Sequence, residues 1–173
     1  DLPTLTQLLP TAEKIVAAFS NLQNQIGLID PDQPTQLEFG EILTTWIDHV
    51  SISDPSPDTK LSLTALYTKA LSDLQNLYQE IDPLKSQKYQ QQKQLLVKRL
   101  EHYLRSQKLT QLEPHAATLL LFSQTLDPEI AERIYEQTLK NLNPTFITGY
   151  FNLFYLQVMA QFGDAQDVKN LLT

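Results

Sequence analysis

Residues 144–173, PTFITGYFNLFYLQVMAQFGDAQDVKNLLT, contain the helix start and stop signals of a helical hairpin. Pro144 breaks the chain ahead of an aromatic segment whose composition and spacing predict a helix. We expect this helix to stop at Gly163, since glycine commonly follows the last turn of a helix. Asp164 can then cap a second helix, because its side chain accepts hydrogen bonds from the first free backbone N–H groups. The stretch therefore predicts two helices joined by a tight turn.

Similar helix start signals recur upstream of this hairpin. Asp82-Pro83, Glu113-Pro114 and Asp127-Pro128 each put an acidic residue at an N-cap and a proline in the first helical turn. Apolar residues follow each start at spacings of three and four, whereas no segment alternates convincingly as a strand would. We therefore expect a single all-α domain over residues 1–173, built from seven or eight helices in antiparallel hairpins. The starts are unevenly spaced, which disfavours a solenoid of repeats.

Two more helices are predicted in the N-terminal part. The first should end at Gly27 and the second should run from about Thr59 to Glu80. Residues 28–38 and 51–58 are typical of loops because of their prolines, and a short apolar segment lies between them. The apolar stripe of the first helix consists of Leu8, Ala12, Ile15, Phe19, Leu22 and Ile26. In the helix after Pro83, the glutamines at 90, 91, 92 and 94 are expected to form a solvated outer face.

Composition narrows the classes of function. The chain has 173 residues, enough for one domain with a core, and 42% of them are hydrophobic. Its net charge of −7 argues against a nucleic-acid partner, because that affinity rests on clustered Lys and Arg. A neutral or cationic partner, or an uncharged substrate, agrees better with this negative net charge.

The absence of certain residues and segments narrows the location and the chemistry. No cysteine is present, which excludes disulfides, thiolate metal sites and cysteine nucleophiles and is compatible with a cytoplasmic location. The N-terminus has no signal-peptide pattern, and no window approaches the ~20 apolar residues of a membrane span, so we expect no membrane partner. The three histidines stand in no metal-ligand spacing. We expect neither a metal nor another cofactor.

Two aromatic residues are candidates for a binding site. Trp46, the only tryptophan, lies in FGEILTTWIDHV (residues 39–50) with a predicted loop on either side. Its ring is suited to stack on the apolar face of a sugar, although a single tryptophan is also a common core residue. Tyr150 lies in the first turn of the predicted aromatic helix, where its hydroxyl could reach a pocket at the hairpin mouth or pack inside. Phe151 and Phe154 are expected to be core residues.

Four segments, taken in order, resemble the central part of bacterial α-L-rhamnosidase catalytic domains. They are GLID (27–30), FGEILTTWIDHV with LTALYTKAL (63–71), PHAATLLLFSQTLDPEIAERIYEQTL (114–139) and FITGYFNLFYLQVMAQFGDAQDVKNLLT (146–173). The family counterparts are a GL-[IL] turn, a short Phe-Gly-Asp-Trp type element with a helix LNALYYxAL, a helix pair QxNALALxxGLxPEE, and a hairpin TGxxGTPYxxxAL…GxxDxAxxLL. The resemblance covers most of the chain from about Gly27 onward.

This resemblance implies a fold and an activity. The fold is an (α/α)6 toroid of six helical hairpins, of which this chain holds about half. The activity is inverting hydrolysis of terminal α-L-rhamnose, with two carboxyl groups roughly 6.5–9.5 Å apart. In the family the general acid precedes the region matched here and the general base follows the final hairpin. We therefore expect a fragment of a larger glycoside hydrolase that holds no catalytic carboxylate and is inactive alone.

The resemblance also implies which residues contact the sugar. Trp46 would stack on the rhamnose ring, and Tyr150 would line the same pocket. The family has Asp before the tryptophan, whereas this chain has Thr45, so Asp48 is the candidate for the missing polar contact. The alternative is a non-catalytic helical scaffold that binds a partner protein. Half a toroid would also leave an apolar face uncovered, which predicts a possible homodimer.

Overall fold

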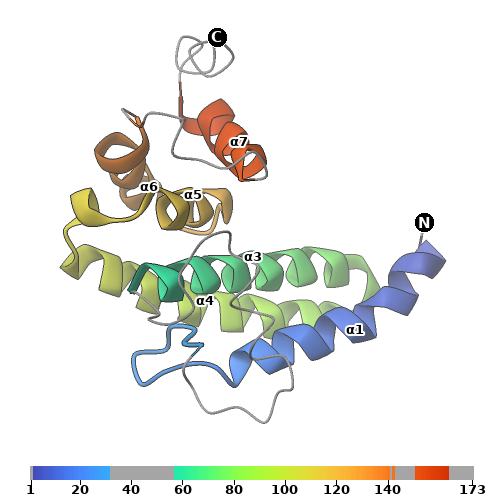
Figure 1. Cartoon of the computed structure of the whole chain (residues 1–173). Coiled ribbons are helices and arrows are strands. Elements are labelled where there is room, and N and C mark those ends of the chain that lie inside the picture. Colours follow the sequence, from blue (N-terminus) through green and yellow to red (C-terminus); the bar gives the residue numbers. More distant parts are fainter. Residues whose placement is uncertain (1, 32–56, 141, 143–150, 164–173) are drawn as a thin grey trace.

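The structure is a computed structural model that describes residues 2–31, 57–140, 142 and 151–163 (Figure 1). Within these residues every regular element is helical, apart from one isolated bridge between Gln23 and Ile29, so the all-α prediction is confirmed. The elements are α1 (Leu2–Ser20), α3 (Pro57–Ile81), α4 (Pro83–Ser106), the 3-10 turn η1 (Leu109–Gln111), α5 (Pro114–Phe122), α6 (Pro128–Ile134), the π-helical segment η2 (Tyr135–Leu139) and α7 (Asn152–Phe162).

The helix starts predicted at Asp82, Glu113 and Asp127 are confirmed, whereas the start predicted at Asp164 lies outside the described residues. The Asp82 carboxylate accepts hydrogen bonds from the backbone N–H groups of Leu84 and Lys85, both at 3.2 Å. The Asp127 carboxylate accepts one from the N–H of Glu129 at 3.0 Å. Each proline stands in the first turn, where its missing N–H leaves no hydrogen bond broken. The glutamines at 90, 91, 92 and 94 in α4 are exposed, as expected for an outer face.

The first helix ends at Ser20 and not at Gly27, so that prediction is wrong. The side-chain oxygen of Asn24 accepts hydrogen bonds from the N–H groups of Ile26 and Leu28, which folds the chain into a turn. Gly27 adopts φ +85°, a left-handed conformation that a helix interior does not contain. The chain then returns so that Ile29 can donate to the Thr64 hydroxyl of α3 at 2.9 Å. Side-chain hydrogen bonding thus overrides the apolar spacing.

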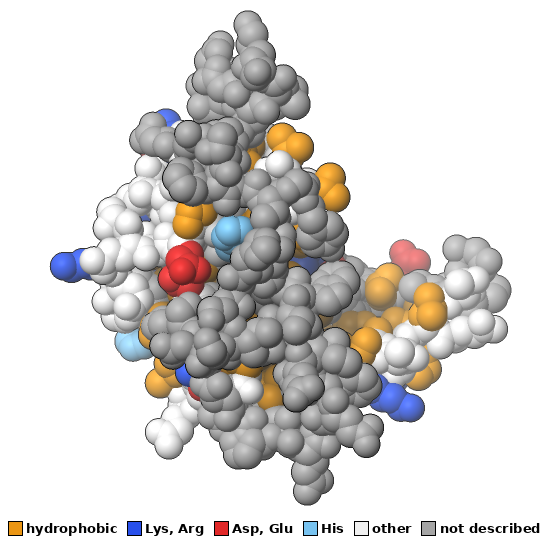
Figure 2. Space-filling model, viewed as in Figure 1, with side chains coloured by type: hydrophobic (Ala, Val, Ile, Leu, Met, Phe, Trp, Pro, Cys, Tyr) orange, Lys and Arg blue, Asp and Glu red, His pale blue; other side chains and the backbone are white. Residues whose placement is uncertain are grey.

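The predicted apolar stripe of α1 is also partly wrong. Leu8 and Ile15 are 60% and 55% exposed, whereas their neighbours Leu9 and Val16 are buried. Hydrophobic side chains group over α1 at the right of Figure 2. Both faces of α1 therefore carry large apolar residues. Packing against α3 and α4 buries the face that includes Leu9 and leaves the face that includes Leu8 exposed.

Helices α3 and α5 run in the same direction. Near their starts, the Glu113 N–H donates to the Asp58 carboxylate at 3.4 Å. Further along, the Thr125 hydroxyl just after α5 donates to the Thr68 hydroxyl inside α3 at 3.2 Å. Because the start of one helix meets the start of the other, α3 and α5 are parallel neighbours.

Helix α7 continues this arrangement on the other side of α5. The rings of His115 and Phe151, at the starts of α5 and α7, lie 4.5 Å apart. Towards the opposite ends, the Gln124 amide donates to the Gln161 side-chain oxygen at 3.1 Å. Helices α3, α5 and α7 therefore form a row of parallel helices, and Figure 1 shows α3, α5 and α7 stacked in this order.

The remaining helices form a second row in the opposite direction. Asp82 alone separates α3 from α4, so these two helices form a tight antiparallel hairpin. Helix α1 runs parallel to α4, since Glu13 pairs with Lys85 and Gln23 accepts from Arg99. The pair α6–η2 follows the same direction as α4. The Asp127 N–H donates to Glu101 within α4, and the Thr138 hydroxyl donates to the Leu109 carbonyl beyond the end of α4.

The core fills the space between the two rows. One cluster joins α3, α4, α5, α6 and α7 through fully buried residues such as Leu100, Leu120 and Ile134. A second cluster joins α1 to α3 and α4 through Leu9, Val16 and others. Helix α3 contributes to both clusters and so ties α1 to the rest of the molecule.

The connections between helices differ at the two ends of the rows. Short turns join α3 to α4 and α5 to α6 at one end. At the other end, longer connections join α1 to α3, α4 to α5 and η2 to α7 (residues 21–56, 107–113 and 140–151). Loops held by a rigid scaffold are common places for binding residues, and the described connection 107–113 is such a segment, so this second end is where a site is expected.

Candidate functional site

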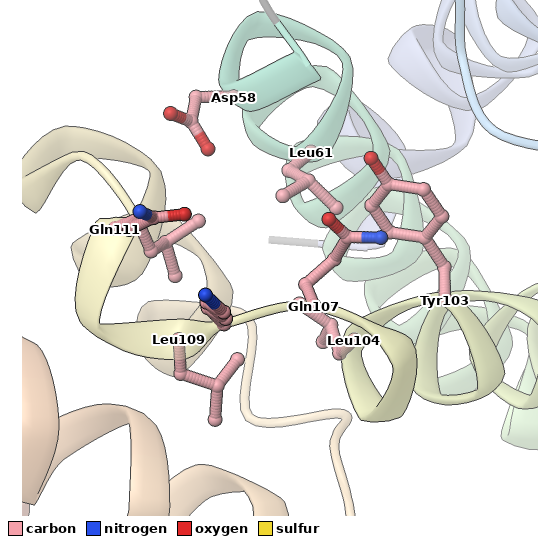
Figure 3. A pocket seen from close by; sticks show the side chains of 9 residues that line it. Asp58, Leu61, Tyr103, Leu104, Gln107, Leu109 and Gln111 are labelled. Carbon is pink, nitrogen blue, oxygen red and sulfur yellow. The ribbon is translucent and has the colours of Figure 1, made fainter.

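A cavity of about 180 Å³ opens at the end with the long connections (Figure 3). It lies between the start of α3, the end of α4 and the turn η1. Its lining combines polar side chains with leucines: Asp58, Leu61, Tyr103, Leu104, Gln107, Lys108, Leu109, Gln111 and Leu112. Leu61, Leu104 and Leu109 from these three elements are buried in the same apolar cluster, and η1 packs against α6 and η2.

Asp58 supplies the carboxylate of this cavity. It lies in the first turn of α3 and accepts the 3.4 Å hydrogen bond from the backbone N–H of Glu113. Burial raises the pKa of the Asp58 carboxyl, the hydrogen bond from Glu113 acts to lower it, and the nearby charge of Glu113 raises it further. The net effect is a raised pKa, so Asp58 holds its proton more readily than an exposed aspartate.

Amide and phenol groups complete the polar lining. In Figure 3 the side chains of Asp58, Gln107, Gln111 and Tyr103 surround the cavity, with Leu61 between them. The side-chain amide of Gln107 donates to the Ser106 hydroxyl at 3.1 Å, which steadies it beside the end of α4. An amide and a phenol each donate and accept hydrogen bonds. The cavity therefore offers both kinds of partner to a small ligand.

The residues predicted as a sugar site lie outside the described part of the structure. Trp46 and Asp48 fall within residues 32–56, and Tyr150 falls within residues 143–150. Their chain connections nevertheless start and finish at the same end of the rows, because Pro57 begins α3 and Phe151 directly precedes α7. Of the aromatic residues predicted to be core, Phe151 is buried, and Phe154 packs edge-on against Phe122 with ring centroids 4.9 Å apart.

A second polar cluster joins α1 to the α3–α4 hairpin. The Glu13 carboxylate accepts from the Lys85 ammonium at 2.7 Å and from the Tyr89 hydroxyl at 3.2 Å. The hydrogen bond from Lys85 is the main reason that the pKa of Glu13 is lowered, and the same bond raises the pKa of Lys85 to about 12. The Lys85 ammonium also lies 4.9 Å from the centre of the Tyr78 ring. This cluster links α1 to the α3–α4 hairpin through an ion pair and hydrogen bonds.

Two searches of the described residues bear on the predicted classes. The described residues contain no group of three or more His, Asp or Glu side chains that could hold a metal ion. None of their helices is both long and apolar enough to cross a membrane. Searches against protein-family models, curated proteins and solved structures found no match to this chain. The proposals below therefore rest on the residues and on their arrangement.

Proposed function

We propose that this chain is the middle of a glycoside hydrolase catalytic domain of the α-L-rhamnosidase type. The sequence segments from GLID to the C-terminal hairpin, which resemble this family in order, support the proposal. In that setting the domain removes terminal α-L-rhamnose with inversion, and its carbohydrate substrate is uncharged. The lack of cysteine fits a reducing compartment such as the cytoplasm.

The observation that carries the proposal is the direction of the helices. Helices α3, α5 and α7 run one way, and their hairpin partners run the other way in a second row. A toroid of six hairpins repeats this pattern around a ring, with one row facing the axis. The described hairpins are what one arc of such a toroid would contain, and closing the ring would require further hairpins.

The positions at which the segments of the predicted sugar site join the helices also agree with the toroid proposal. The connection that holds Trp46 and Asp48 leads into the start of α3, and Tyr150 directly precedes Phe151 at the start of α7. Both segments thus join the row of α3, α5 and α7 at one end. We propose that Trp46 stacks on the rhamnose ring and that Tyr150 lines the pocket. Asp48 would hydrogen bond to the sugar in place of the family's Asp, whose position is occupied by Thr45 in this chain. The two catalytic carboxylates would come from elsewhere in a longer protein.

Hydrolysis of an aryl α-L-rhamnoside tests the proposal. We expect the chain of 173 residues to release no product, and a longer natural gene product that includes it to be active. In that longer protein Trp46→Ala should lower kcat/KM by roughly tenfold or more, because stacking on a sugar is worth on the order of 1–2 kcal/mol. Trp46→Phe, which keeps a ring, serves as the matched control and should lose less. Activity that is absent from the longer protein, or unchanged in Trp46→Ala, would contradict the proposal.

A second candidate is a helical scaffold that binds a partner protein. The exposed leucine and isoleucine of α1, Leu8 and Ile15, favour it, because apolar residues grouped on a surface often mark an interface. The fluorescence of Trp46 separates the two candidates, since Trp46 is the only tryptophan. Strong quenching by acrylamide favours a ring open to a ligand. Blue-shifted and protected emission favours the scaffold, in which Trp46 is a core residue.

A further inference from the structure

The cavity beside Asp58 is lined by residues of α3, α4 and the η1 turn, whereas Trp46, Asp48 and Tyr150 lie outside the described residues. We propose that it binds a small, neutral molecule with several hydroxyl groups, such as a single sugar ring or a cyclic polyol. This inference stands on the described cavity alone and does not rest on the proposed hydrolase activity. Size, polar groups and charge support it in turn.

The size of the cavity restricts the ligand. Pockets that hold drug-sized molecules measure about 300–1,000 Å³. The cavity here measures about 180 Å³. It is therefore suited to one ring with its substituents and not to a nucleotide or a peptide segment.

The polar groups match hydroxyls. A hydroxyl donates one hydrogen bond and accepts others, so it needs both kinds of partner. Asp58 accepts, while the side chains of Gln107, Gln111 and Tyr103 can both donate and accept. Among the described residues, the Gln111 amide and the Tyr103 hydroxyl have no hydrogen bond within the protein, so both remain available to a ligand. The leucines between these groups, of which Leu61 lies between Asp58 and Tyr103 in Figure 3, can contact the C–H faces of a ring.

The charges of the lining favour a neutral ligand. Among the described lining residues, Asp58 supplies the one carboxylate and Lys108 the one ammonium, so the charges of this described lining balance. An anionic ligand would face the Asp58 carboxylate. A divalent cation would find a single carboxylate, whereas Ca²⁺ takes about six to eight oxygen ligands. A neutral polyhydroxyl molecule meets neither obstacle.

Chemical-shift mapping on the ¹⁵N-labelled chain tests the inference. The probes are D-glucose, L-rhamnose and myo-inositol, with gluconate and glucosamine as charged analogues of similar size. We expect at least one neutral probe to cause saturable shifts of the backbone amides of residues 107–112, with a Kd on the order of millimolar. Gln111→Leu should weaken this binding about tenfold, because it removes a hydrogen-bonding partner and leaves ligand hydroxyls unpaired.

Gln94→Leu is the matched control for this experiment. It makes the same chemical change at an exposed position of α4 that does not line the cavity, and binding should be unchanged. The inference is wrong if no neutral probe shifts residues 107–112, if a charged analogue binds more tightly there, or if Gln111→Leu and Gln94→Leu behave alike. A shift confined to the Trp46 indole N–H would also contradict it, although that result would agree with the proposed rhamnoside site. The two proposals can therefore fail separately.

Discussion

Gly27 occupies a backbone conformation that other residues adopt only at a cost. Its φ of +85° lies in the left-handed region, and an added Cβ would come within 2.6 Å of the Arg99 side chain. We expect Gly27→Ala to reduce the free energy of unfolding by about 1–2 kcal/mol, chiefly through the backbone, because the end of Arg99 can move aside. Urea denaturation measures the change.

Gly163→Ala is the control for this prediction. Gly163 ends α7 with φ −78°, which any residue adopts, so the substitution should leave stability unchanged or raise it slightly. Equal losses in the two variants would show that the conformation of Gly27 is not what makes glycine necessary there.

Single residues also show why the candidate cavity was not visible in the sequence. Asp58, Tyr103, Gln107 and Gln111 share no spacing that is typical of a site, because they come from the start of one helix, the end of another and a 3-10 turn. Only the shared apolar cluster, to which α3, α4 and η1 contribute Leu61, Leu104 and Leu109, brings them together. Trp46 stands out in the sequence by its residue type alone, and it lies outside the described residues.

At the scale of the element, helix starts were predictable because their signals are local. Asp82 and Asp127 cap the helices that immediately follow them. The end and the buried face of α1 were not predictable in this way. Adjacent apolar pairs, Leu8 with Leu9 and Ile15 with Val16, allow two stripes, and only contact with α3 and α4 chooses between them.

The caps give a prediction that compares two helix starts. Asp82 accepts two backbone hydrogen bonds at the start of α4, whereas Glu113 accepts none with its side chain at the start of α5. Asp82→Ala should therefore cost about 1 kcal/mol of unfolding free energy, a typical value for an N-cap. Glu113→Ala, the control, should cost much less. A similar loss in both variants, measured by thermal or urea unfolding, would count against a capping role for the Asp82 side chain.

The attachment of α1 should depend on pH in the acid range. The hydrogen bond from Lys85 lowers the pKa of Glu13 from its usual 4.5. A group whose pKa is lower in the folded state stabilises the fold above its unfolded pKa, and this contribution is lost as the pH falls through the folded value. We therefore expect amide exchange in α1 to accelerate below a pH of 4.5, relative to exchange in α5.

Two variants check this dependence. Glu13→Gln should speed exchange in α1 at neutral pH and weaken its dependence on acid. Glu136→Gln removes an ion pair with Lys140 within one turn of a helix and should leave α1 unchanged. If Glu13→Gln left the exchange of α1 unaltered at every pH, the ion pair with Lys85 would not contribute to holding this helix.

At the scale of the whole molecule, α1 and α7 are the outermost described helices of the two rows. Helix α1 stands at one end and exposes Leu8 and Ile15, while α7 stands at the other and exposes 62% of Leu153. Further hairpins would cover these surfaces in a complete toroid. In the chain alone, we expect them to associate with a second copy, because exposed apolar patches tend to find partners.

Sedimentation velocity over a range of concentrations measures this association. The chain should form dimers as its concentration rises, and the double variant Leu8→Gln with Ile15→Gln should shift the equilibrium towards monomer. Leu84→Gln is the control, since Leu84 is 80% exposed but lies at the turn between α3 and α4 and belongs to neither α1 nor α7. A chain that stays monomeric at every concentration would contradict the expected dimer. Equal effects of Leu84→Gln and the double variant would place the interface elsewhere, at the end with the short turns.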